Sequence, residues 1–557
     1  MAIWQRTRLN LRRRCHLALI LWVSLDCAMA KGEGPPALKQ ENSDSARIER
    51  LEKMLFTVIQ ENQRLAGDVR TLKQQIESQT PDARDLKVRQ AAETQSEIRQ
   101  GESSVPQVPA EPPSQSLPAE SVPLDFLPNL DRGLWEPMNL PDSSGVPESL
   151  DSLPSGLARG PDRFRLDYDN GFAIVPLDPD ETPFSLRVRS QNVFRYNGFT
   201  RGETNWTDSA GNRIPITDSN YFGIPRGRLI FSGMALFPEL TYLLNIDYNS
   251  VTNNPIGFRA YVLSYRFSNA LELSVGQSKV PGSREWLESA FAPLQGPDRS
   301  MATTFFRPSL SQGIWITGEP LEGWHYHAMM SNGFNTLNLL PERLSDRFCW
   351  SGSTWWEPLG EFGAGYSDLQ NHTDVAVRMG ASYTYSIGRG NQSESDAVEN
   401  SPIRLSDGTL ITTPGALAPG VTLQSYDISL AAVDLAYKYR GLGLSSELYF
   451  QDLQGLQGSG PLPIRSTGAF GGFLQGGYFV LPQKAELYAR SSYVTGDYGA
   501  GYEIAGGFNW FFRKGRENLR FTLDSAWLDH SPAGQNRTGY VAGQTGFLLR
   551  TQITAAY

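Results

Sequence analysis

"FSLRVRSQNVFRYN", residues 184–197, alternates apolar and polar side chains with a period of two, and "RGRLIFSGMALF", residues 226–237, repeats this pattern. The apolar face comprises Phe184, Leu186, Val188, Phe194, Tyr196, Leu229, Phe231, Ala235 and Phe237. The opposite face comprises Arg187, Arg189, Gln191, Arg195, Asn197, Arg226, Arg228 and Ser232. In a soluble sandwich the apolar face would form the core. In an outer-membrane barrel it would contact lipid, and the arginines would line a water-filled lumen.

The region 161–557 continues this pattern, with short alternating segments separated by Gly, Asn, Asp and Pro. Such regular short strands are typical of an all-β sandwich, propeller or barrel. The ending "FLLRTQITAAY", residues 547–557, resembles the last-strand signal read by outer-membrane barrel assembly machinery. We therefore predict a transmembrane antiparallel β-barrel of about 16 strands. Two long irregular segments, 278–312 and 388–424, are expected to be loops, one of which folds inward to narrow the pore.

The N-terminal residues 1–30 are predicted to be a signal peptide. Five arginines precede an apolar stretch, and Ala28-Met29-Ala30 forms a cleavage motif. After this stretch no run of apolar residues approaches the ~20 that a spanning helix needs. The formal net charge of −9 argues against a nucleic-acid partner. The sequence thus indicates a protein exported beyond the inner membrane.

A short N-terminal segment, 31–47, precedes a heptad pattern that predicts a coiled coil over 48–80. The a positions are Ile48, Leu55, Asn62, Val69 and Ile76, and the d positions are Leu51, Val58, Leu65 and Leu72. One amphipathic helix lying on its own barrel is the alternative, and the residues at a and d leave dimer and trimer open. Residues 81–160 form a polar, Pro-rich linker that separates this helix from the barrel.

Five motifs in the barrel region occur in the order seen in the phosphate-selective porin O and P family, which the chain resembles over about 162–557. They are "YDNGFAI" (168–174), "RGRLIFSG" (226–233), "VGQSKVPGSREWLES" (275–289), "PDRS" (297–300) and "MSNGFN" (330–335). The resemblance implies a trimeric, 16-stranded outer-membrane channel with arginines along the lumen and lysines near its mouths. The chain departs from the family pattern at Gly227, between two arginines, and in inward acidic residues such as Asp247 and Glu272.

An anion that enters a narrow pore loses hydration, which guanidinium groups can replace with charge-assisted, often bidentate hydrogen bonds. Arginines two residues apart on one strand would form a ladder along which the ion passes from site to site. The candidate pore-lining or anion-binding residues are Arg187, Arg189, Arg195, Arg226, Arg228, Asp247, Lys279, Arg284 and Arg299, the last three of these expected to form the constriction from the inward loop. For each arginine the alternative is a wall charge that pairs with a lumenal carboxylate.

The predicted function is a passive outer-membrane porin for small solutes with a preference for phosphate-like anions. The alternatives are a general non-selective porin and an outer-membrane anchor whose coiled coil and linker bind a periplasmic cell-wall partner. We expect no enzyme activity, because the five histidines form no group with Ser and Asp, and we expect no cofactor and no metal. The expected partners are outer-membrane lipid, small anions and two further copies of the chain, with the coiled coil in the periplasm.

Overall fold

The computed structural model describes residues 163–168, 171–252, 255–289, 291, 294–337, 339–389 and 402–557. The predicted signal peptide (1–30), the N-terminal segment (31–47), the coiled coil (48–80) and the linker (81–160) lie outside the described residues. Among the residues that are described, no helix is long and apolar enough to cross a membrane.

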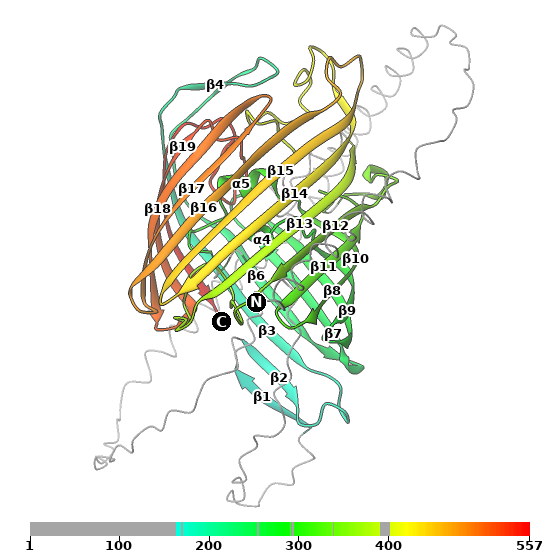
Figure 1. Ribbon diagram of the computed structural model, residues 1–557, viewed down its shortest axis with the longest axis vertical. Helices are drawn as coiled ribbons and strands as arrows, with labels where there is room; N and C mark the ends of the chain where they lie inside the picture. Colours follow the sequence, from blue (N-terminus) through cyan, green and yellow to red (C-terminus); the bar gives the residue numbers. More distant parts are fainter. Residues whose placement is uncertain are drawn as a thin grey trace, which may run out of the picture. The chain divides into compact units, whose positions relative to one another are not determined.

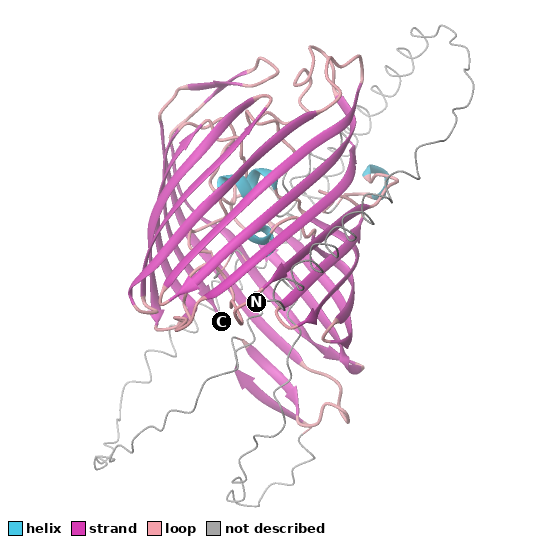
Figure 2. Cartoon of the chain, in the orientation of Figure 1, coloured by secondary structure: helices cyan, strands magenta, loops and turns pink. Residues whose placement is uncertain are grey.

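β-strands hold most of the described residues, and the helices are three short segments (Figure 2). The strands preceding the inward helices are β1 (Phe164–Tyr168), β2 (Phe172–Pro176), β3 (Leu186–Arg201), β4 (Asn205–Thr207), β5 (Arg213–Pro215), β6 (Ser219–Ala235), β7 (Phe237–Tyr248), β8 (Ile256–Ser268) and β9 (Leu271–Lys279). The helices are α4 (Arg284–Leu287), α5 (Met301–Phe306) and the 3-10 turn η1 (Pro341–Arg343). The remaining strands are β10 (Leu310–Leu321), β11 (Trp324–Ser331), β12 (Cys349–Trp356), β13 (Ala376–Arg389), β14 (Leu423–Tyr439), β15 (Leu442–Gly458), β16 (Thr467–Leu481), β17 (Ala485–Gly496), β18 (Gly499–Arg513), β19 (Arg516–Asp529) and β20 (Gly546–Ala556).

Sixteen of these strands, β3 and β6 to β20, form a closed antiparallel barrel (Figure 1). Each pairs with the next in sequence, and β20 closes the ring by pairing with β3 from Gly546↔Arg201 to Ala556↔Gln191. Closure leaves no unpaired edge in the lipid, where an unsatisfied backbone group is costly. The expected barrel and its strand number are therefore confirmed. A hairpin of β1 and β2 extends the sheet beyond the end of β20, through the pair Phe172↔Val188.

The two ends of the barrel differ in the length of their connections. At the end where β20 finishes, most turns are tight, as in the two-residue turn Arg440-Gly441 between β14 and β15. Both of its residues have positive φ, 48° and 85°, which is the backbone that a tight hairpin with right-handed strand twist requires. The opposite end carries the longer connections, including 202–218, 280–309, 332–348, 390–422 and 530–545. In outer-membrane barrels short turns face the periplasm and long loops face outward.

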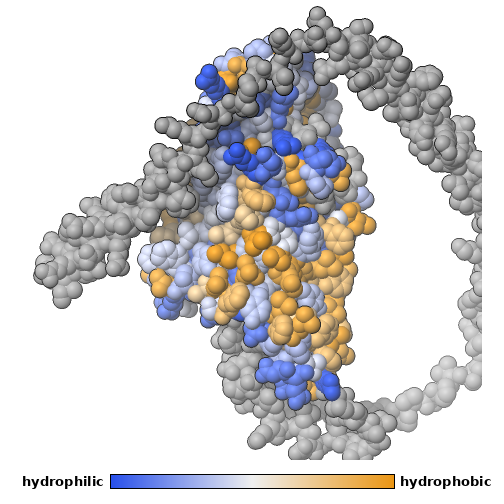
Figure 3. All heavy atoms as spheres, turned by 90° about the vertical axis from the view of Figure 1, so that its right-hand side faces the viewer, coloured by the Kyte–Doolittle hydropathy of each residue, from blue (hydrophilic) through white to orange (hydrophobic). Residues whose placement is uncertain are grey.

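The alternation predicted for residues 184–237 is observed in the barrel wall. Phe194 is half exposed on the outer surface, whereas its neighbour Arg195 is almost completely buried on the inner side. Figure 3 shows apolar side chains gathered over a broad part of the outer face that carries β7 to β11. Gly227, between the two arginines of β6, lies on the outer face beneath the ring of Tyr248, where an added Cβ would stand 2.1 Å from a ring carbon. This glycine therefore permits aromatic packing outside and leaves the lumenal positions of Arg226 and Arg228 unchanged.

The interior of the barrel is filled on one side by inward-folded connections. The β9–β10 segment, residues 280–309, carries α4 and α5 inside the barrel (Figures 1 and 2), where its described residues are buried. Residues from 402–422 and 530–545 join α5 and the inner faces of β14 to β20 in one apolar cluster that includes Phe306, Ile428 and Tyr540. The expectation that one long loop folds inward agrees with this arrangement, but Lys279 ends β9 and Leu310 begins β10, so the irregular segment is shorter than predicted. A further inward segment, 357–375, enters from the end with short turns and buries Phe362 and Tyr366.

We predict that Leu474→Arg, on the outer face of β16, lowers the free energy of unfolding by about 2–4 kcal/mol, the cost of an arginine facing lipid near the bilayer midplane. Leu474 is 61% exposed and lies in the middle of its strand. Urea unfolding in lipid vesicles measures the change, with Leu474→Phe as the apolar control. Equal stability of the two variants would contradict the outward orientation.

Candidate functional site

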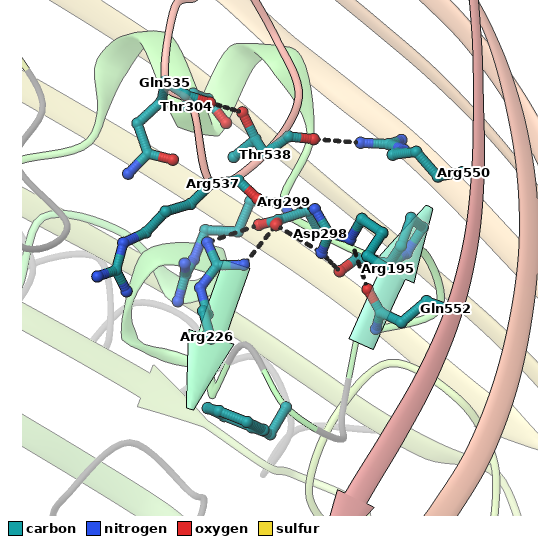
Figure 4. Close-up of polar contacts among 12 residues, drawn as sticks. Arg195, Arg226, Asp298, Arg299, Thr304, Gln535, Arg537, Thr538, Arg550 and Gln552 are labelled. Carbon is teal, nitrogen blue, oxygen red and sulfur yellow. Dashed lines mark hydrogen bonds and ion pairs between the residues drawn. The ribbon is translucent and has the colours of Figure 1, made fainter. Parts of the chain in front are cut away.

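Two arginines from neighbouring strands of the wall share one carboxylate inside the barrel (Figure 4). Arg226 of β6 approaches Asp298 with both terminal nitrogens, and Nη2 donates to Oδ1 at 3.1 Å. Nη2 of Arg195, from β3, donates to Oδ2 at 3.1 Å. All three side chains are at most 1% exposed. A carboxylate held by a guanidinium fork and a second arginine is a strong, geometrically specific contact.

Arg195 also holds other parts of the interior together. Its Nε donates to Oε1 of Gln552 on β20 at 2.8 Å, and its Nη1 donates to the carbonyl oxygen of Arg537 at 2.7 Å. Its Nη2 also donates to the carbonyl oxygen of Pro297 at 2.8 Å. One guanidinium group therefore joins the wall, the β9–β10 segment and the β19–β20 connection.

The three polar side chains of the motif Pro297-Asp298-Arg299-Ser300 each bind a different part of the protein. Asp298 binds the wall arginines, while Arg299 donates to the carbonyl oxygens of Glu285 and Glu288, both at 2.9 Å. Ser300 caps α5 by accepting from the backbone N of Thr303 at 3.1 Å. Asp298 thus lies between α4 and α5, and the contacts of Arg299 with α4 and of Ser300 with α5 fix the backbone beside it.

Three further strands of the wall, β17, β18 and β19, hold the backbone of the β9–β10 segment. Arg490 of β17 donates to the carbonyl oxygen of Asp298 at 2.9 Å. Asn509 of β18 donates to that of Gln295 at 2.8 Å, and Arg520 of β19 to that of Leu294 at 2.7 Å. Only β20 separates β19 from β3 in the ring, so these contacts join the segment to the part of the wall that continues from β3 through β20.

The charge of Asp298 is stabilised by its neighbours. Burial alone would raise the pKa of this carboxyl group, but Arg226 and Arg195 outweigh burial and hold the pKa well below its usual range. Asp298 is therefore ionised at neutral and at mildly acidic pH.

A second carboxylate shared by two arginines lies on the same wall, nearer to the end with short turns. Asp247 of β7, which is fully buried, forms ion pairs with Nε of Arg228 at 3.5 Å and with Nη1 of Arg537 at 2.7 Å. The Arg228 guanidinium also lies 4.4 Å from the centre of the Phe291 ring. Asp247 thus orients two guanidinium groups.

Lys279 and Arg299, predicted to narrow the pore, both lie against α4. Lys279 Nζ donates to the carbonyl oxygens of Leu287 and Glu288 at 2.6 and 2.8 Å. Together with Arg307, both side chains lie within 5.2 Å of the Trp286 ring centre. Cations at these carbonyl groups satisfy acceptors that a short helix leaves unpaired.

Arg284, the third residue predicted for the constriction, contacts the 357–375 segment. Its guanidinium lies 4.4 Å from the Tyr366 ring centre and donates to the carbonyl oxygen of Gly365 at 3.2 Å. It also forms an ion pair with Glu288 at 3.8 Å. Arg284 therefore links the two inward segments.

Arg187 and Arg189 lie apart from the Asp298 cluster, on the inner face of β3 near the end where β20 finishes. They pair in register with Ser232 and Ile230, whereas Arg226 pairs with Val193 farther along the strand. Both keep intermediate exposure, in contrast to the buried Arg195. The nine residues proposed from the sequence thus form several groups on the wall and on the β9–β10 segment.

The interior contains charged residues that were not selected from the sequence. Among them are Asp298, Arg490, Glu503, Arg520, Asp524, Arg537 and Arg550. Arg550 Nη2 pairs with Asp524 at 2.6 Å across β20 and β19, and Arg490 Nη2 pairs with Glu503 at 2.7 Å across β17 and β18. The period-two pattern could have identified the strand residues, because each lies at an inward position. Asp298 and Arg537 lie in connections, where no periodicity indicates direction.

Two histidines on β11, His325 and His327, share the inner face, because alternate residues of a strand point to the same side. His325 stacks on Trp355 with ring centres 5.1 Å apart, while His327 is buried. Within the described ranges, no group of three or more His, Cys, Asp or Glu residues could hold a metal ion.

Comparison with known proteins gives a family match over most of the barrel. Residues 210–554 match the family described as phosphate-selective porin O and P. No match is found among curated protein sequences.

Solved structures that resemble the chain include an anion-selective porin from Comamonas acidovorans, with 12% identity and a TM-score of 0.43 over 67% of this chain and 100% of that one. Another is a loop-deletion variant of OmpT, an outer membrane protein of Vibrio cholerae, with 11% identity and a TM-score of 0.42 over 67% and 99%. OprB of Pseudomonas putida shares 10% identity with a TM-score of 0.41 over 67% and 94%.

We predict that Arg550→Met lowers the free energy of unfolding by about 3–5 kcal/mol, because it leaves the buried carboxylate of Asp524 without its arginine. The double variant Arg550→Met/Asp524→Leu should recover most of this loss, since no unpaired charge remains. Urea unfolding of the three proteins provides the comparison, and a double variant no more stable than the single one would contradict the pairing.

We predict that the stability contribution of Asp298 is retained on mild acidification. A carboxyl group whose pKa is lowered on folding contributes stability above its unfolded pKa of about 3.9, and this contribution is lost as the pH falls through the folded pKa. The difference in unfolding free energy between the natural protein and Asp298→Asn should therefore stay constant from pH 7 to about 5 and shrink only below about pH 4. Urea unfolding at pH 7, 5 and 3 measures it, and a difference already halved at pH 5 would contradict the assigned ion pairs.

Proposed function

This chain belongs to the phosphate-selective porin O and P family, and from this premise we propose that it is a passive outer-membrane channel with a preference for small, phosphate-like anions. Membership of this family points to an outer-membrane porin rather than an enzyme. The observation that carries the anion preference is the sharing of one buried carboxylate, Asp298, by Arg195 and Arg226.

The balance of charge in the cluster supports this preference. The carboxylates Asp298, Asp247, Asp524 and Glu503 pair with Arg195, Arg226, Arg228, Arg537, Arg550 and Arg490. Two of the four carboxylates are each shared by two arginines, so this set carries two more guanidinium groups than carboxylates. Excess positive charge in a confined, low-dielectric space attracts anions and repels cations. The net charge of −9 for the whole chain does not oppose this, because the local field acts on an ion in the lumen.

Arg187 and Arg189 supply the accessible part of the proposed path. Their guanidinium groups belong to inward positions that keep intermediate exposure near the end with short turns. They are the next guanidinium groups along β3 after Arg195, beyond Val193 and Gln191, and their exposure suits weak, exchangeable contacts with an anion. A general porin would not require charge of one sign at this mouth.

The proposed assembly is a homotrimer in the outer membrane with the N-terminal coiled coil in the periplasm. This part of the proposal rests on the heptad pattern at 48–80 and on the family resemblance. A channel role and a tethering role differ in their dependence on residues 31–160. Deleting these residues should preserve conductance in planar bilayers, whereas a pure anchor would have no conductance to preserve.

We predict that reversal potentials in a KCl gradient indicate chloride preference, and that Arg187→Gln/Arg189→Gln reduces this preference, because it removes two positive charges from a partly exposed lumenal surface. The control is Arg201→Gln, an exposed arginine at the opposite end of β3, where the long connections lie, that pairs with Asp218. The double variant should unfold like the natural protein. Cation preference in the natural channel would overturn the proposed selectivity.

A further inference from the structure

Asp298 occupies the position in which two arginines of the wall could bind an anion. Its carboxylate oxygens accept from both terminal nitrogens of Arg226 and from Nη2 of Arg195 (Figure 4). A carboxylate presents two oxygens in a plane, and a phosphate ion can present two of its oxygens to the same guanidinium fork. The Asp298 side chain therefore stands in chemically for an oxyanion.

The carboxylate and the arginines come from different parts of the chain. Arg195 and Arg226 belong to paired strands of the barrel wall, whose register is fixed by backbone hydrogen bonds. Asp298 belongs to the β9–β10 segment, in the short connection between α4 and α5. The anion-binding groups are thus part of the rigid wall, whereas the anion that they hold is carried by a connection.

The backbone around Asp298 is held by contacts that do not depend on the Asp298 side chain. Arg490 donates to the carbonyl oxygen of Asp298, and Asn509 to that of Gln295, and neither contact involves the Asp298 carboxylate. Arg299 is likewise held through α4. Rotation of the Asp298 side chain breaks its contacts with the two arginines and with the backbone N of Arg299, which donates to Oδ1 at 3.0 Å, but it leaves the contacts that anchor the segment in place.

Release without a replacement would leave two buried guanidinium groups without their shared carboxylate, which is strongly unfavourable. An incoming anion removes this obstacle, because the arginines retain an ionised acceptor throughout the exchange. Permeant anions and the internal carboxylate are then competitors for one site.

We propose that Arg195 and Arg226 form an oxyanion-binding site of the channel and that Asp298 is a tethered internal anion which a passing phosphate displaces. This inference rests on the proposed anion channel and adds to it a site and its self-occupation. Competition multiplies the apparent affinity of the site by the fraction of time for which Asp298 leaves the site open.

The test is inhibition of chloride current by inorganic phosphate in planar bilayers at fixed KCl and pH 7. Asp298→Asn removes the competing charge while preserving side-chain size, and we expect the half-inhibiting phosphate concentration to fall at least about tenfold, as it should if Asp298 occupies the site for more than about nine-tenths of the time. Asp298→Glu restores a carboxylate and should return this concentration to within about threefold of the natural value.

The matched control is Asp524→Asn, which removes a buried lumenal carboxylate that is fixed to the wall beside Arg550. It measures the general effect of one negative charge less in the lumen. Equal shifts for Asp298→Asn and Asp524→Asn, or an unchanged value for Asp298→Asn, would overturn the inference. Retained heat-modifiable migration in gels shows that each variant is folded, and Asp298→Ser is the replacement for testing if the Asn variant is not.

The reversal potential of the same channels separates this inference from the proposed function. Chloride preference in the natural protein, with no specific effect of Asp298→Asn, refutes only the tethered anion. A natural channel without anion preference that gains it in Asp298→Asn, but not in Asp524→Asn, refutes the proposed function and supports self-occupation of the site.

Discussion

The pairing of β3 with β20 on one side and β6 on the other is the constraint on which the remaining structure depends. A backbone that crosses lipid must satisfy all of its hydrogen bonds within the protein, and a sheet achieves this only by closing on itself. Once β3 is paired on both edges, its alternating side chains must point either outward or into the barrel. Phe194 faces outward and Arg195 faces inward. The same register brings Arg226 beside Val193, so that arginines from two strands reach one carboxylate.

Sixteen strands enclose more space than their own side chains fill, and the inward connections occupy much of it. The resulting interior has two chemical parts. Apolar side chains of 402–422, 530–545 and α5 pack against β14 to β20, as in the core of a soluble protein. Buried ion pairs instead join the β9–β10 segment to β3 and β6. Apolar contacts hold a segment in place whatever ions are present. A segment held by a shared carboxylate depends instead on the charges of that carboxylate and of its arginines.

Much of the fold follows from the sequence because period-two alternation is a local property that lipid on one side and water on the other enforce at every strand. The strand number, the direction of Arg195 and Arg226, and the outward face of the last strand could all be inferred in this way. The roles of Lys279, Arg284 and Arg299 could not, since the direction of a side chain in an irregular segment depends on distant partners. Asp298 lies 103 residues from Arg195 in the chain. Its role required the three-dimensional register of the β9–β10 segment.

A saturated ion pair and a transport site place opposite demands on an arginine. Arg195 donates through Nε, Nη1 and Nη2 to partners within the protein, which stabilises the interior but occupies the donors that a solute would need. Conduction requires contacts that are strong enough to admit an ion and weak enough to release it. Both demands can be met only where a protein acceptor and a solute acceptor are exchangeable. The carbonyl oxygens of Pro297 and Arg537 are fixed by the backbone, and the Gln552 side chain is uncharged. The Asp298 carboxylate is thus the one charged acceptor of Arg195 that a solute anion would replace in the proposed exchange.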